Sequence, residues 1–400
     1  MRRATATPAT IAVLLGSLAG LGPFALDTYL PAFPEIAASL GTNRAMLQQS
    51  LTSYLVPYAA MMLVHGPISD RYGRRATIIG AMSFFCAGSL GCALSQSIEA
   101  FLGWRGLQGL AVGATTVVGR ALIRDLFEGP AAQRQFAQVN LVFTLAPVLA
   151  PIVGGYLLTT VGWRSIFWFL LGYPAALLAA CLRWLPETLA PEKRLPLRLT
   201  VVAANLTVLV RKPRFGAFAL MIAASFCGFF VYVLAAPTFV RDLLALKPTE
   251  FGWLFLFTAA GTLVGSAWAA RRAAVKTPAA TIGLGLSLSA LAAIASVGYH
   301  ATFPPALPWS VLPLGLYCCG NALMLPSATL LCLDSSPLPR GATSSLQSFA
   351  QIVCAALTGA VLVPIVGQSA LWLALTMLGW WLVCVFCWRA IRNGVLTSPR

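Results

Sequence analysis

Long apolar runs alternate with short polar loops along nearly the whole chain of 400 residues. Each run has about the 20 residues that a helix needs to cross a bilayer. The pattern therefore predicts an all-α membrane protein with twelve spans. They cover approximately residues 11–30, 46–68, 76–94, 97–117, 135–158, 165–185, 215–237, 251–270, 279–299, 309–331, 344–364 and 369–388.

The composition supports this class, because 58% of the residues are hydrophobic and only 10% are charged. A soluble globular domain carries about 25% charged residues. The mean hydropathy is +0.81, and a surface so poor in charge needs lipid over most of its area. A water-soluble protein is therefore excluded.

The positions of the basic residues predict the orientation of the spans. The net charge is +16, which in a soluble protein would suggest a nucleic-acid partner. With an even number of spans both termini lie on one side, and that side collects most of the 27 basic residues. By the positive-inside rule this side is the cytoplasm. Because the charges are scattered over short loops, we expect a lipid bilayer and no nucleic acid as the partner.

The longest charged interruption runs from Pro186 to Arg214 and divides the spans six and six. We predict two pseudo-symmetric six-helix bundles, at residues 1–186 and 214–400, joined by a cytoplasmic linker at 187–213. Duplicated membrane proteins of this kind are typically transporters with a site between the repeats. Within the linker, Leu199 to Val210 suits a helix along the membrane surface.

The ten cysteines fall in or at the ends of predicted spans, where they are expected as small buried apolar residues. Cys384 and Cys387 have the spacing of a metal or redox pair, but no histidine lies near them. We expect neither a metal nor a cofactor. His65, at the cytoplasmic end of the second span, is interpreted as a satisfied interfacial histidine rather than a proton shuttle.

Ten residues between the second and third spans are unusually polar for this chain. They read Gly66-Pro67-Ile68-Ser69-Asp70-Arg71-Tyr72-Gly73-Arg74-Arg75, with one acid and three arginines within six positions. This decapeptide resembles the signature Gly-x-x-x-Asp-Arg-x-Gly-Arg-Arg/Lys of the major facilitator superfamily, in the place where that family has it. The resemblance implies the major facilitator fold and transport by alternating access.

Further motifs follow in the order typical of that superfamily. Arg105-Gly106-Leu107-Gln108-Gly109 is similar to its fourth-helix motif, Arg-x-x-Gln-Gly. Residues 146–155 are similar to the fifth-helix motif of proton-coupled antiporters, with alanine at 146 and 150 where glycine is commoner. Pro186-Glu187-Thr188-Leu189 resembles the usual exit from the sixth helix.

Within the superfamily the chain resembles the bicyclomycin/chloramphenicol-resistance drug-efflux family. The resemblance lies in residues 27–34, 120–127 and 162–167, which read Asp-Thr-Tyr-Leu-Pro-Ala-Phe-Pro, Arg-Ala-Leu-Ile-Arg-Asp-Leu-Phe and Gly-Trp-Arg-Ser-Ile-Phe. It implies a proton antiporter of the bacterial cytoplasmic (inner) membrane that expels small amphipathic drugs. We expect a multi-pass monomer with protons and a small-molecule drug as its ligands.

Asp27 is the one acid that the pattern places inside an apolar span. A charged side chain at this depth costs about 2.5–3.5 kcal/mol and should face the interior with a partner. Burial favours the protonated form of a carboxylate and a nearby cation favours the charged form. Such a group can bind a proton or a cationic drug in turn, so we interpret Asp27 as the proton- and substrate-binding acid. A structural acid near the outer loop is the alternative.

Arg105 is the one base inside a span, in the outer half of residues 97–117. It stays charged, and its depth is compatible with pairing to Asp27 or with a shared water network. Gln108, one turn further on, is a candidate for hydrogen bonding in the cavity. A static pair that positions the two helices is the alternative role.

The decapeptide is interpreted as a cytoplasmic gate formed with Asp125. Asp70 is expected to cap the eleventh span, which we predict to begin at 341–345 with good N-cap residues. The resemblance implies a contact between Arg74 and Asp125, while Arg71 and Arg75 are explained equally well as topology anchors. Gly66 and Gly73 belong to the same gate.

Two further groups of residues are assigned from residue type and depth. In the fifth span, prolines kink a helix and glycines allow close packing, which predicts a hinge at Pro147, Pro151, Gly154 and Gly155. Static packing of small residues is the alternative. An apolar drug site needs aromatic side chains with a few polar anchors; the candidates are Tyr54, Asn140, Phe143, Phe226, Phe230, Tyr232 and Asn321.

Two other functions are compatible with parts of the pattern. A facilitator-type exporter of a metabolite, such as a sugar, an amino acid derivative or a siderophore, has the same architecture. A membrane enzyme or receptor lacks support, because the chain contains no His-Glu cluster, nucleophile motif or P-loop.

Overall fold

The computed structural model describes residues 7–197, 199–273 and 275–393, and within them every regular element is a helix. The chain divides into two compact units, Met1–Val202 and Ala203–Arg400. We call them the first and the second unit. The boundary lies inside the segment that the sequence predicts as a linker.

The first unit contains seven α-helices. They are α1 Pro8–Asp27, α2 Phe33–Ser39, α3 Arg44–Tyr72, α4 Arg74–Leu94, α5 Ile98–Leu126, α6 Gly129–Val161 and α7 Arg164–Trp184. Short 3-10 turns, η1 Leu30–Ala32 and η2 Pro191–Lys193, follow α1 and α7. Helix α8, Leu199–Arg211, runs across the boundary into the second unit.

The second unit is built from α9 Pro213–Leu234, α11 Gly252–Ala273, α12 Pro278–Thr302, α13 Leu312–Asp334, α14 Arg340–Leu357 and α16 Ala370–Arg392. Short turns, α10 Ala236–Thr238, η3 Phe239–Leu243 and η4 Pro248–Glu250, connect α9 to α11. A π-turn, η5 Thr358–Leu362, and α15 Val363–Val366 continue α14.

Eleven helical segments of the described residues are long and apolar enough to cross a membrane, and they match eleven of the twelve predicted spans. The remaining predicted span, 46–68, forms α3, whose 29 residues reach about 43 Å at the usual rise per residue. Polar side chains such as Gln48, Gln49 and His65 keep its composition below that of the other spans. Composition alone therefore identifies eleven spans, and the length of α3 supplies the twelfth long helix.

The helices begin where the local sequence supplies capping groups. The side chain of Asn43 accepts a hydrogen bond from the backbone amide of Met46 at the start of α3, and Ser97 and Thr277 do the same for α5 and α12. Such caps satisfy amides that have no partner inside the helix. The predicted start of the eleventh span at 341–345 is wrong by a residue. Helix α14 begins at Arg340 without a side-chain cap, and the Thr343 hydroxyl instead donates to the Pro339 carbonyl at 3.2 Å.

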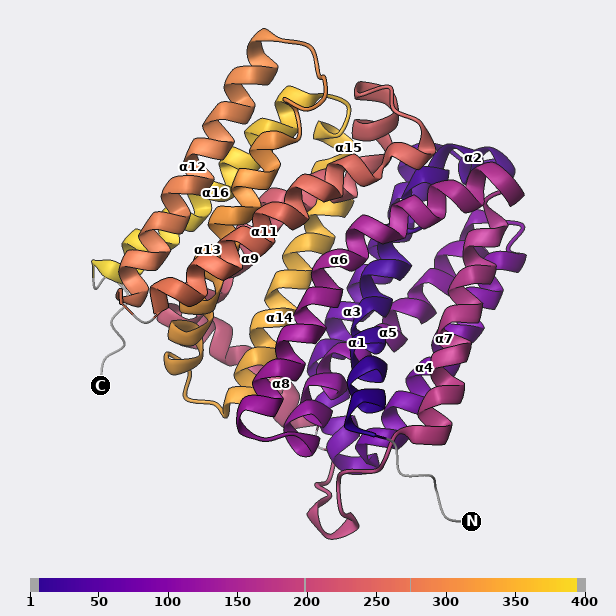
Figure 1. Cartoon of the computed structure of the whole chain (residues 1–400), viewed down its shortest axis with the longest axis vertical. Coiled ribbons are helices and arrows are strands. Elements are labelled where there is room, and N and C mark those ends of the chain that lie inside the picture. The colour runs from indigo at the N-terminus through magenta and orange to yellow at the C-terminus, as the bar shows by residue number, and fades with distance from the viewer. Residues whose placement is uncertain (1–6, 198, 274, 394–400) are drawn as a thin grey trace. The chain divides into compact units, whose positions relative to one another are not determined.

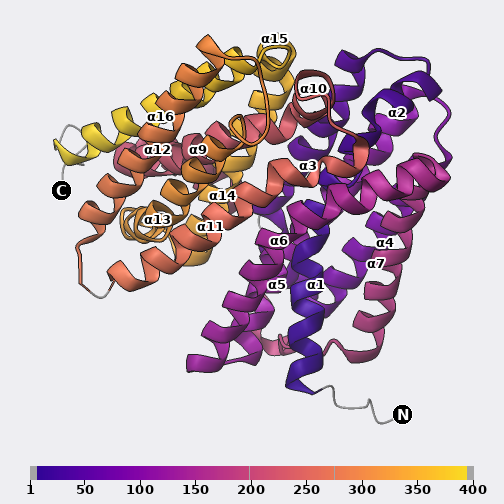
Figure 2. The same cartoon turned by 45° about the horizontal axis from the view of Figure 1, so that its top comes forward.

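The two units repeat one packing scheme. In the first, α5 packs on α3 and α4, α4 also packs on α7, and α1 packs on α6 (Figures 1 and 2). In the second, α13 packs on α11 and α12, α12 also packs on α16, and α9 packs on α14. The duplication that is faint in the sequence is therefore clear in the contacts within each unit, and α3 occupies the position that α11 has in the second.

Glycines lie where these helices come closest together. Gly109 of α5 lies against the Tyr54 carbonyl of α3, and Gly261 of α11 lies against the Gly315 carbonyl of α13. Side chains at these glycines would collide with backbone atoms of the neighbouring helix. Small residues at such crossings are typical of membrane helix bundles.

Candidate functional site

Asp27 is the last residue of α1 and lies inside the first unit. Its side chain is 3% exposed, and its Oδ1 atom is buried without a hydrogen-bond partner among the described residues. The helix ends here with Thr28, whose hydroxyl donates to the Phe24 carbonyl at 2.6 Å. Burying an acid with an unsatisfied oxygen costs folding free energy. Packing alone therefore does not explain an acid at this position.

Arg105 of α5 is fully buried in the same region. Its Nη1 atom donates to the Ala25 carbonyl at 3.0 Å and to Gln108 Oε1 at 2.6 Å. The guanidinium lies between two aromatic rings, 4.4 Å from the centroid of Tyr29 and 4.6 Å from that of Tyr54. Cation–π contacts of this kind stabilise a desolvated cation by about 2 kcal/mol or more.

No ion pair joins Asp27 and Arg105 among the residues described. Direct pairing, one of the two arrangements that the sequence allowed, is therefore absent. Arg105 instead binds a carbonyl in the last turn of α1, where helix carbonyls lack an internal partner and a positive charge is favoured. Its Nε and Nη2 atoms have no hydrogen-bond partner. The acid and the base thus meet at the same end of α1 without neutralising each other.

Tyr54 and Gln108 connect this centre to its surroundings. The Tyr54 hydroxyl donates to the Gly22 carbonyl of α1 at 3.3 Å, and its ring centroid lies 4.6 Å from the Arg105 guanidinium. Gln108 Nε2 donates to the Ser89 hydroxyl of α4 at 2.8 Å. Both side chains are buried, so in this structure they hold the charged centre together and face no open cavity.

The other predicted pocket residues fall into two groups. In the first unit, Asn140 and Phe143 are exposed and line a small cavity of about 50 Å³ with residues of α1 and α5, including Thr116 and Arg120. The Tyr58 hydroxyl reaches Thr116 at 3.4 Å. This cavity is smaller than a drug-sized ligand needs.

In the second unit the candidates belong to the contacts around α9. Phe226 and Phe230 stack with their centroids 4.6 Å apart. Asn321 accepts from the Ser225 hydroxyl at 2.5 Å and donates to the Ser225 carbonyl at 2.8 Å. Tyr232 is fully buried and its hydroxyl lies 3.4 Å from Ser296. Asn321 and Tyr232 are thus engaged in internal bonds, and substrate contact by these residues stays a prediction.

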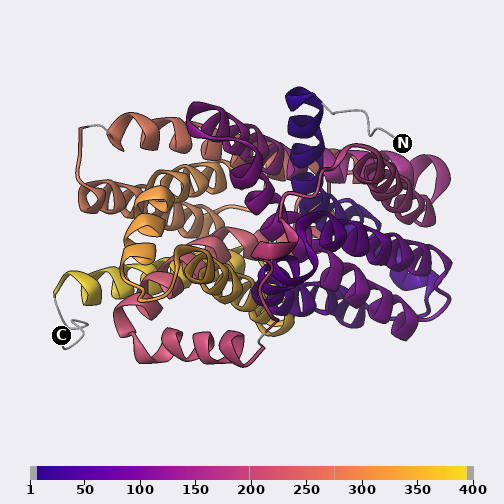
Figure 3. The same cartoon turned by 90° about the horizontal axis from the view of Figure 1, so that it is seen from below.

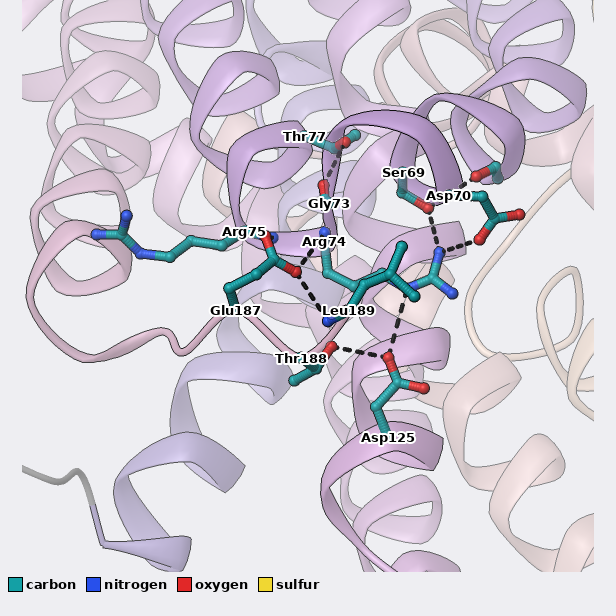
Figure 4. A network of polar contacts seen from close by, with 11 residues as sticks. Ser69, Asp70, Gly73, Arg74, Arg75, Thr77, Asp125, Glu187, Thr188 and Leu189 are labelled. Atoms are coloured by element: carbon teal, nitrogen blue, oxygen red, sulfur yellow. Dashed lines mark hydrogen bonds and ion pairs between the residues drawn. The ribbon is translucent and has the colours of Figure 1, made fainter. Parts of the chain in front are cut away.

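The polar decapeptide forms a network at the junction of α3 and α4 (Figure 4). Arg74 Nη1 donates to Asp70 Oδ1 at 2.6 Å and to the Ser69 hydroxyl at 2.5 Å. Its Nε atom reaches Asp125 Oδ2 at 3.4 Å. The guanidinium of Arg74, at the start of α4, therefore contacts both the end of α3 and the end of α5.

Two residues that the sequence did not single out complete this network. Glu187, just after α7, accepts hydrogen bonds from the backbone amides of Arg74 at 2.9 Å and Arg75 at 3.2 Å (Figure 4). Thr188 donates to Asp125 Oδ2 at 2.8 Å. Both belong to the segment 186–189, which was noted only as the end of a helix. The sequence shows Glu187 as an acid just after a span. Only the fold shows that it binds the start of α4.

Two more bonds join α7 and the chain after it to the same junction. The amide of Leu195 donates to the Asp70 carbonyl at 3.0 Å. Arg75 Nη2 donates to the Leu182 carbonyl at 2.8 Å, so Arg75 has a structural contact besides its value as a topology anchor. Hydrogen bonds therefore join the decapeptide to α7 and to the segment that follows it.

The predicted hinge residues lie within α6, which continues through Pro147 and Pro151 from Gly129 to Val161. Gly154 lies directly against the carbonyl oxygen of Thr28, the residue after Asp27. The glycine thus allows α6 to approach the end of α1 that carries the buried acid. Bending at this place stays a prediction.

His65 differs from the sequence-based interpretation. It is 5% exposed, its ring lies against Gly113 of α5, and its Nδ1 atom has no hydrogen-bond partner. It is a buried histidine of α3 that faces α5, and its unpaired Nδ1 atom contradicts the satisfied histidine that the sequence predicted.

Comparison with known proteins agrees with the motifs and the helix arrangement. The model of the Major Facilitator Superfamily matches residues 15–361. The chain is 32% identical to the Bacillus subtilis uncharacterized MFS-type transporter YdgK, over 89% of this chain and 88% of the relative. It is 28% identical to multidrug resistance protein D of Escherichia coli, over 95% of both chains.

Shorter and more distant matches point the same way. A bicyclomycin resistance protein homolog of Haemophilus influenzae is 34% identical over 60% of this chain and 61% of its own length. The crystal structure of the human organic anion transporter MFSD10 has a TM-score of 0.69 at 19% identity, over 96% of this chain and all of that chain. A crystal structure of a POT peptide transporter has a TM-score of 0.75 at 14% identity, over 97% and 94%. These structures share the fold.

The family consists of secondary transporters, so the chain is a multi-pass membrane transporter and not an enzyme. The decapeptide at 66–75, the fourth-helix motif around Arg105 and the family match over residues 15–361 all agree. The chain belongs to the Major Facilitator Superfamily.

Proposed function

We propose that this transporter exports small amphipathic drugs across the bacterial inner membrane in exchange for protons, by alternating access. Both termini face the cytoplasm and the protein works as a monomer. The names of its relatives, which include multidrug and bicyclomycin resistance proteins, support the substrate class.

The buried carboxylate of Asp27, whose Oδ1 atom has no hydrogen-bond partner, is the observation that carries the proton role. A buried carboxylate without a counter-ion is stabilised by taking up a proton, because burial penalises its charged form. A cationic or polar drug group can provide the same stabilisation. The two ligands then exclude each other, and the exclusion couples their movements in opposite directions.

Arg105 has a supporting role in this scheme. Its charge is held by the rings of Tyr29 and Tyr54 and by the Ala25 carbonyl, so it need not move when Asp27 gains or loses a proton. Arg105 holds the end of α1 that carries Asp27 through this carbonyl contact.

The network around Arg74 is proposed as the cytoplasmic gate. Asp70 and Asp125 both contact this one arginine, and each acid is partly exposed, so the individual ion pairs are weak. Weak pairs that share one cation suit a latch that opens in each transport cycle.

The decisive experiment is pH-gradient-driven transport in proteoliposomes that contain the purified protein. Chloramphenicol and a cationic dye serve as substrates for wild type and for Asp27→Asn. We expect the variant to lose driven transport of both, because asparagine cannot take up a proton. Glu99→Gln is the matched control, since Glu99 is an exposed acid in the first turn of α5 and should tolerate the change.

Full gradient-coupled transport by Asp27→Asn would refute the proton role. Metabolite export is the other candidate, and the same vesicles test it with a sugar, an amino acid derivative and a siderophore. A drug exporter moves chemically unrelated amphiphiles, whereas a metabolite exporter moves one of these compounds and neither drug.

A further inference from the structure

The two histidines of the chain differ in how their ring nitrogens are satisfied. His300 of α12 has both nitrogens engaged, with Nδ1 2.8 Å from the Ser296 carbonyl and Nε2 3.2 Å from the Ser310 hydroxyl. His65 of α3 is 5% exposed, and its Nδ1 atom has no hydrogen-bond partner among the described residues. The Met61 carbonyl, one turn earlier, lies near this ring but outside hydrogen-bond geometry. The Nδ1 atom of His65 is therefore free to bind a proton.

His65 belongs to a row of buried polar side chains on one face of α3. The row consists of Tyr54, Tyr58, His65 and Ser69. At 100° per residue these four positions lie within about 60° of one another. This face packs on α5, and the two helices lie together among the indigo and purple helices of the view from below (Figure 3).

Two contacts place the middle of this row against α5. The Tyr58 hydroxyl lies 3.4 Å from the Thr116 hydroxyl. The His65 ring lies against Gly113, where a side chain would collide with the Nδ1 atom. The glycine thus leaves the space that this nitrogen occupies.

The row connects the two sites described above. At one end, the Tyr54 ring contacts the Arg105 guanidinium and its hydroxyl contacts α1, the helix that ends with the buried acid. At the other end, on the side assigned to the cytoplasm, the Ser69 hydroxyl accepts a hydrogen bond from Arg74. The row is about 22 Å long at the usual rise per residue. His65 lies between its two ends, and imidazole is the group in the row that gains and loses a proton near neutral pH.

The groups that bear on the charge of His65 lie on α3 itself and on the helices that pack on it. They are Tyr58 and Asp70 of α3, Arg120 and Asp125 of α5, Arg74 of α4 and Glu35 of α2. Both Asp70 and Asp125 are bound to Arg74, and α2 joins α3 at the end away from His65. No acid forms an ion pair with His65 in the part of the chain that the structure describes. An imidazolium at this position would therefore lack a counter-ion, which favours a transient proton carrier over a lasting cation.

We propose that His65 carries the proton between Asp27 and the cytoplasm. The inference rests on the proposed function, since it assigns a route to the proton that Asp27 exchanges. A proton that leaves the carboxylic acid of Asp27 reaches Nδ1 of His65 through water and the hydroxyl groups of Tyr54 and Tyr58, and the neutral imidazole becomes an imidazolium. The imidazolium then gives one proton to water on the cytoplasmic side and is neutral again. Only O–H and N–H bonds form and break, and one proton enters the ring for each proton that leaves it.

The test compares two assays of His65→Gln in proteoliposomes. Transport driven by a pH gradient needs net proton movement, whereas exchange of labelled for unlabelled chloramphenicol at equal pH on both sides needs none. We expect driven transport to fall at least about tenfold, because glutamine cannot carry a proton, while exchange continues. His300→Gln is the matched control and should keep the wild-type ratio of the two rates. A wild-type ratio in His65→Gln, whether both rates are kept or both fall together, would overturn the proposal.

Gly113→Ala tests the same nitrogen without changing the histidine. The added methyl group would lie 2.9 Å from Nδ1 of His65, so it covers this atom or displaces the ring. We expect the same selective loss of driven transport. Gly119→Ala is the control in the same helix, because a methyl group there meets no atom within 4 Å. A wild-type ratio in Gly113→Ala, or an equal change of the ratio in Gly119→Ala, contradicts the role assigned to Nδ1.

Asp27→Asn distinguishes the failure of this inference from the failure of the proposed function. If wild type is not driven by the gradient, or if Asp27→Asn is still driven, the proton role of Asp27 fails and the route through His65 fails with it. If Asp27→Asn loses driven transport while His65→Gln and Gly113→Ala keep it, the proton of Asp27 takes another route. Only the role of His65 is then overturned.

Discussion

The carboxylate of Glu187 lies directly against Gly73, in the space that a side chain at position 73 would occupy. Gly73 has a φ of +98°, which ends α3 and lets α4 begin at the next residue. Glu187 then binds the amides of Arg74 and Arg75, two of the unpaired amides of the first turn. The glycine of the signature is thus explained by an acid 113 positions after its neighbour Arg74.

Gly73→Ala should therefore destabilise the first unit. A residue other than glycine at this φ costs about 1–3 kcal/mol, and its methyl group must also displace Glu187. We expect a lower unfolding temperature in detergent and weaker driven transport. Circular dichroism on heating and the proteoliposome assay measure the two effects.

Gly80→Ala is the control for this prediction. Gly80 lies in α4, the helix that follows Gly73, and a methyl group there would meet no atom within 4 Å. Alanine favours a helix over glycine by about 1 kcal/mol, so this variant should be as stable as wild type or slightly more stable. If both variants unfold at one temperature, the contact between Gly73 and Glu187 has no energetic importance.

Glu187→Ala removes the cap from α4. Loss of an N-terminal cap costs about 0.5–2 kcal/mol, and the amides at 74 and 75 lose their acceptor. We expect faster hydrogen–deuterium exchange at the start of α4 and a smaller loss of overall stability. Glu192→Ala, at an exposed acid five residues further on, should leave the exchange unchanged. Equal exchange in wild type and Glu187→Ala would mean that water replaces the cap without cost.

The sequence predicted the elements well because each span is long and carries its own apolar pattern. It also predicted that Asp70, Arg74 and Asp125 belong together, since the signature places two of them in one tight turn and the family relates the third. The burial of Asp27 followed from its place in an apolar run. These features depend on neighbours in sequence or on a family motif.

The features that the sequence missed depend on which helices are neighbours. Glu187 acts on a helix more than a hundred positions away, and nothing near it in sequence shows this. The same is true of Arg105, whose partners are a backbone carbonyl and two rings. The sequence suggested a pair with Asp27 from charge alone, because it does not show which backbone carbonyls and which rings lie beside a buried arginine. The burial of His65 was missed for a similar reason, because the sequence does not show that Gly113 of α5 leaves room for its ring.

Gly154→Ala should displace Asp27 although Asp27 itself is unchanged. A methyl group at 154 would collide with the Thr28 carbonyl and push the end of α1 away from α6. Overpacking of this kind costs about 1–3 kcal/mol, and the displaced residue adjoins Asp27. We expect a larger loss of driven transport than Gly172→Ala causes, because a methyl group at Gly172 in α7 meets no atom within 4 Å. Equal transport by the two variants would show that the packing of α6 against α1 does not affect the proton site.

The rings around Arg105 provide the sharpest test of how its charge is held. Tyr54→Phe keeps the ring under the guanidinium and loses only the 3.3 Å bond to Gly22, so stability and driven transport should stay near wild type. Tyr54→Leu removes the ring, and a desolvated cation–π contact is worth about 2 kcal/mol or more. We expect a lower unfolding temperature and a loss of driven transport in the leucine variant.

Tyr54→Leu also leaves a cavity, and Tyr232 measures that part of the cost. Tyr232 is as deeply buried and packs on Phe239, and no cation–π contact to its ring is found in the described part of the chain. The loss of stability from Tyr to Leu should therefore be larger at 54 than at 232 by about the energy of one cation–π contact. If the two losses are equal, or if the phenylalanine variant fails like the leucine variant, the ring is not what stabilises the charge. Arg105 would then need a partner that it lacks here, and Asp27 is the acid that could supply it.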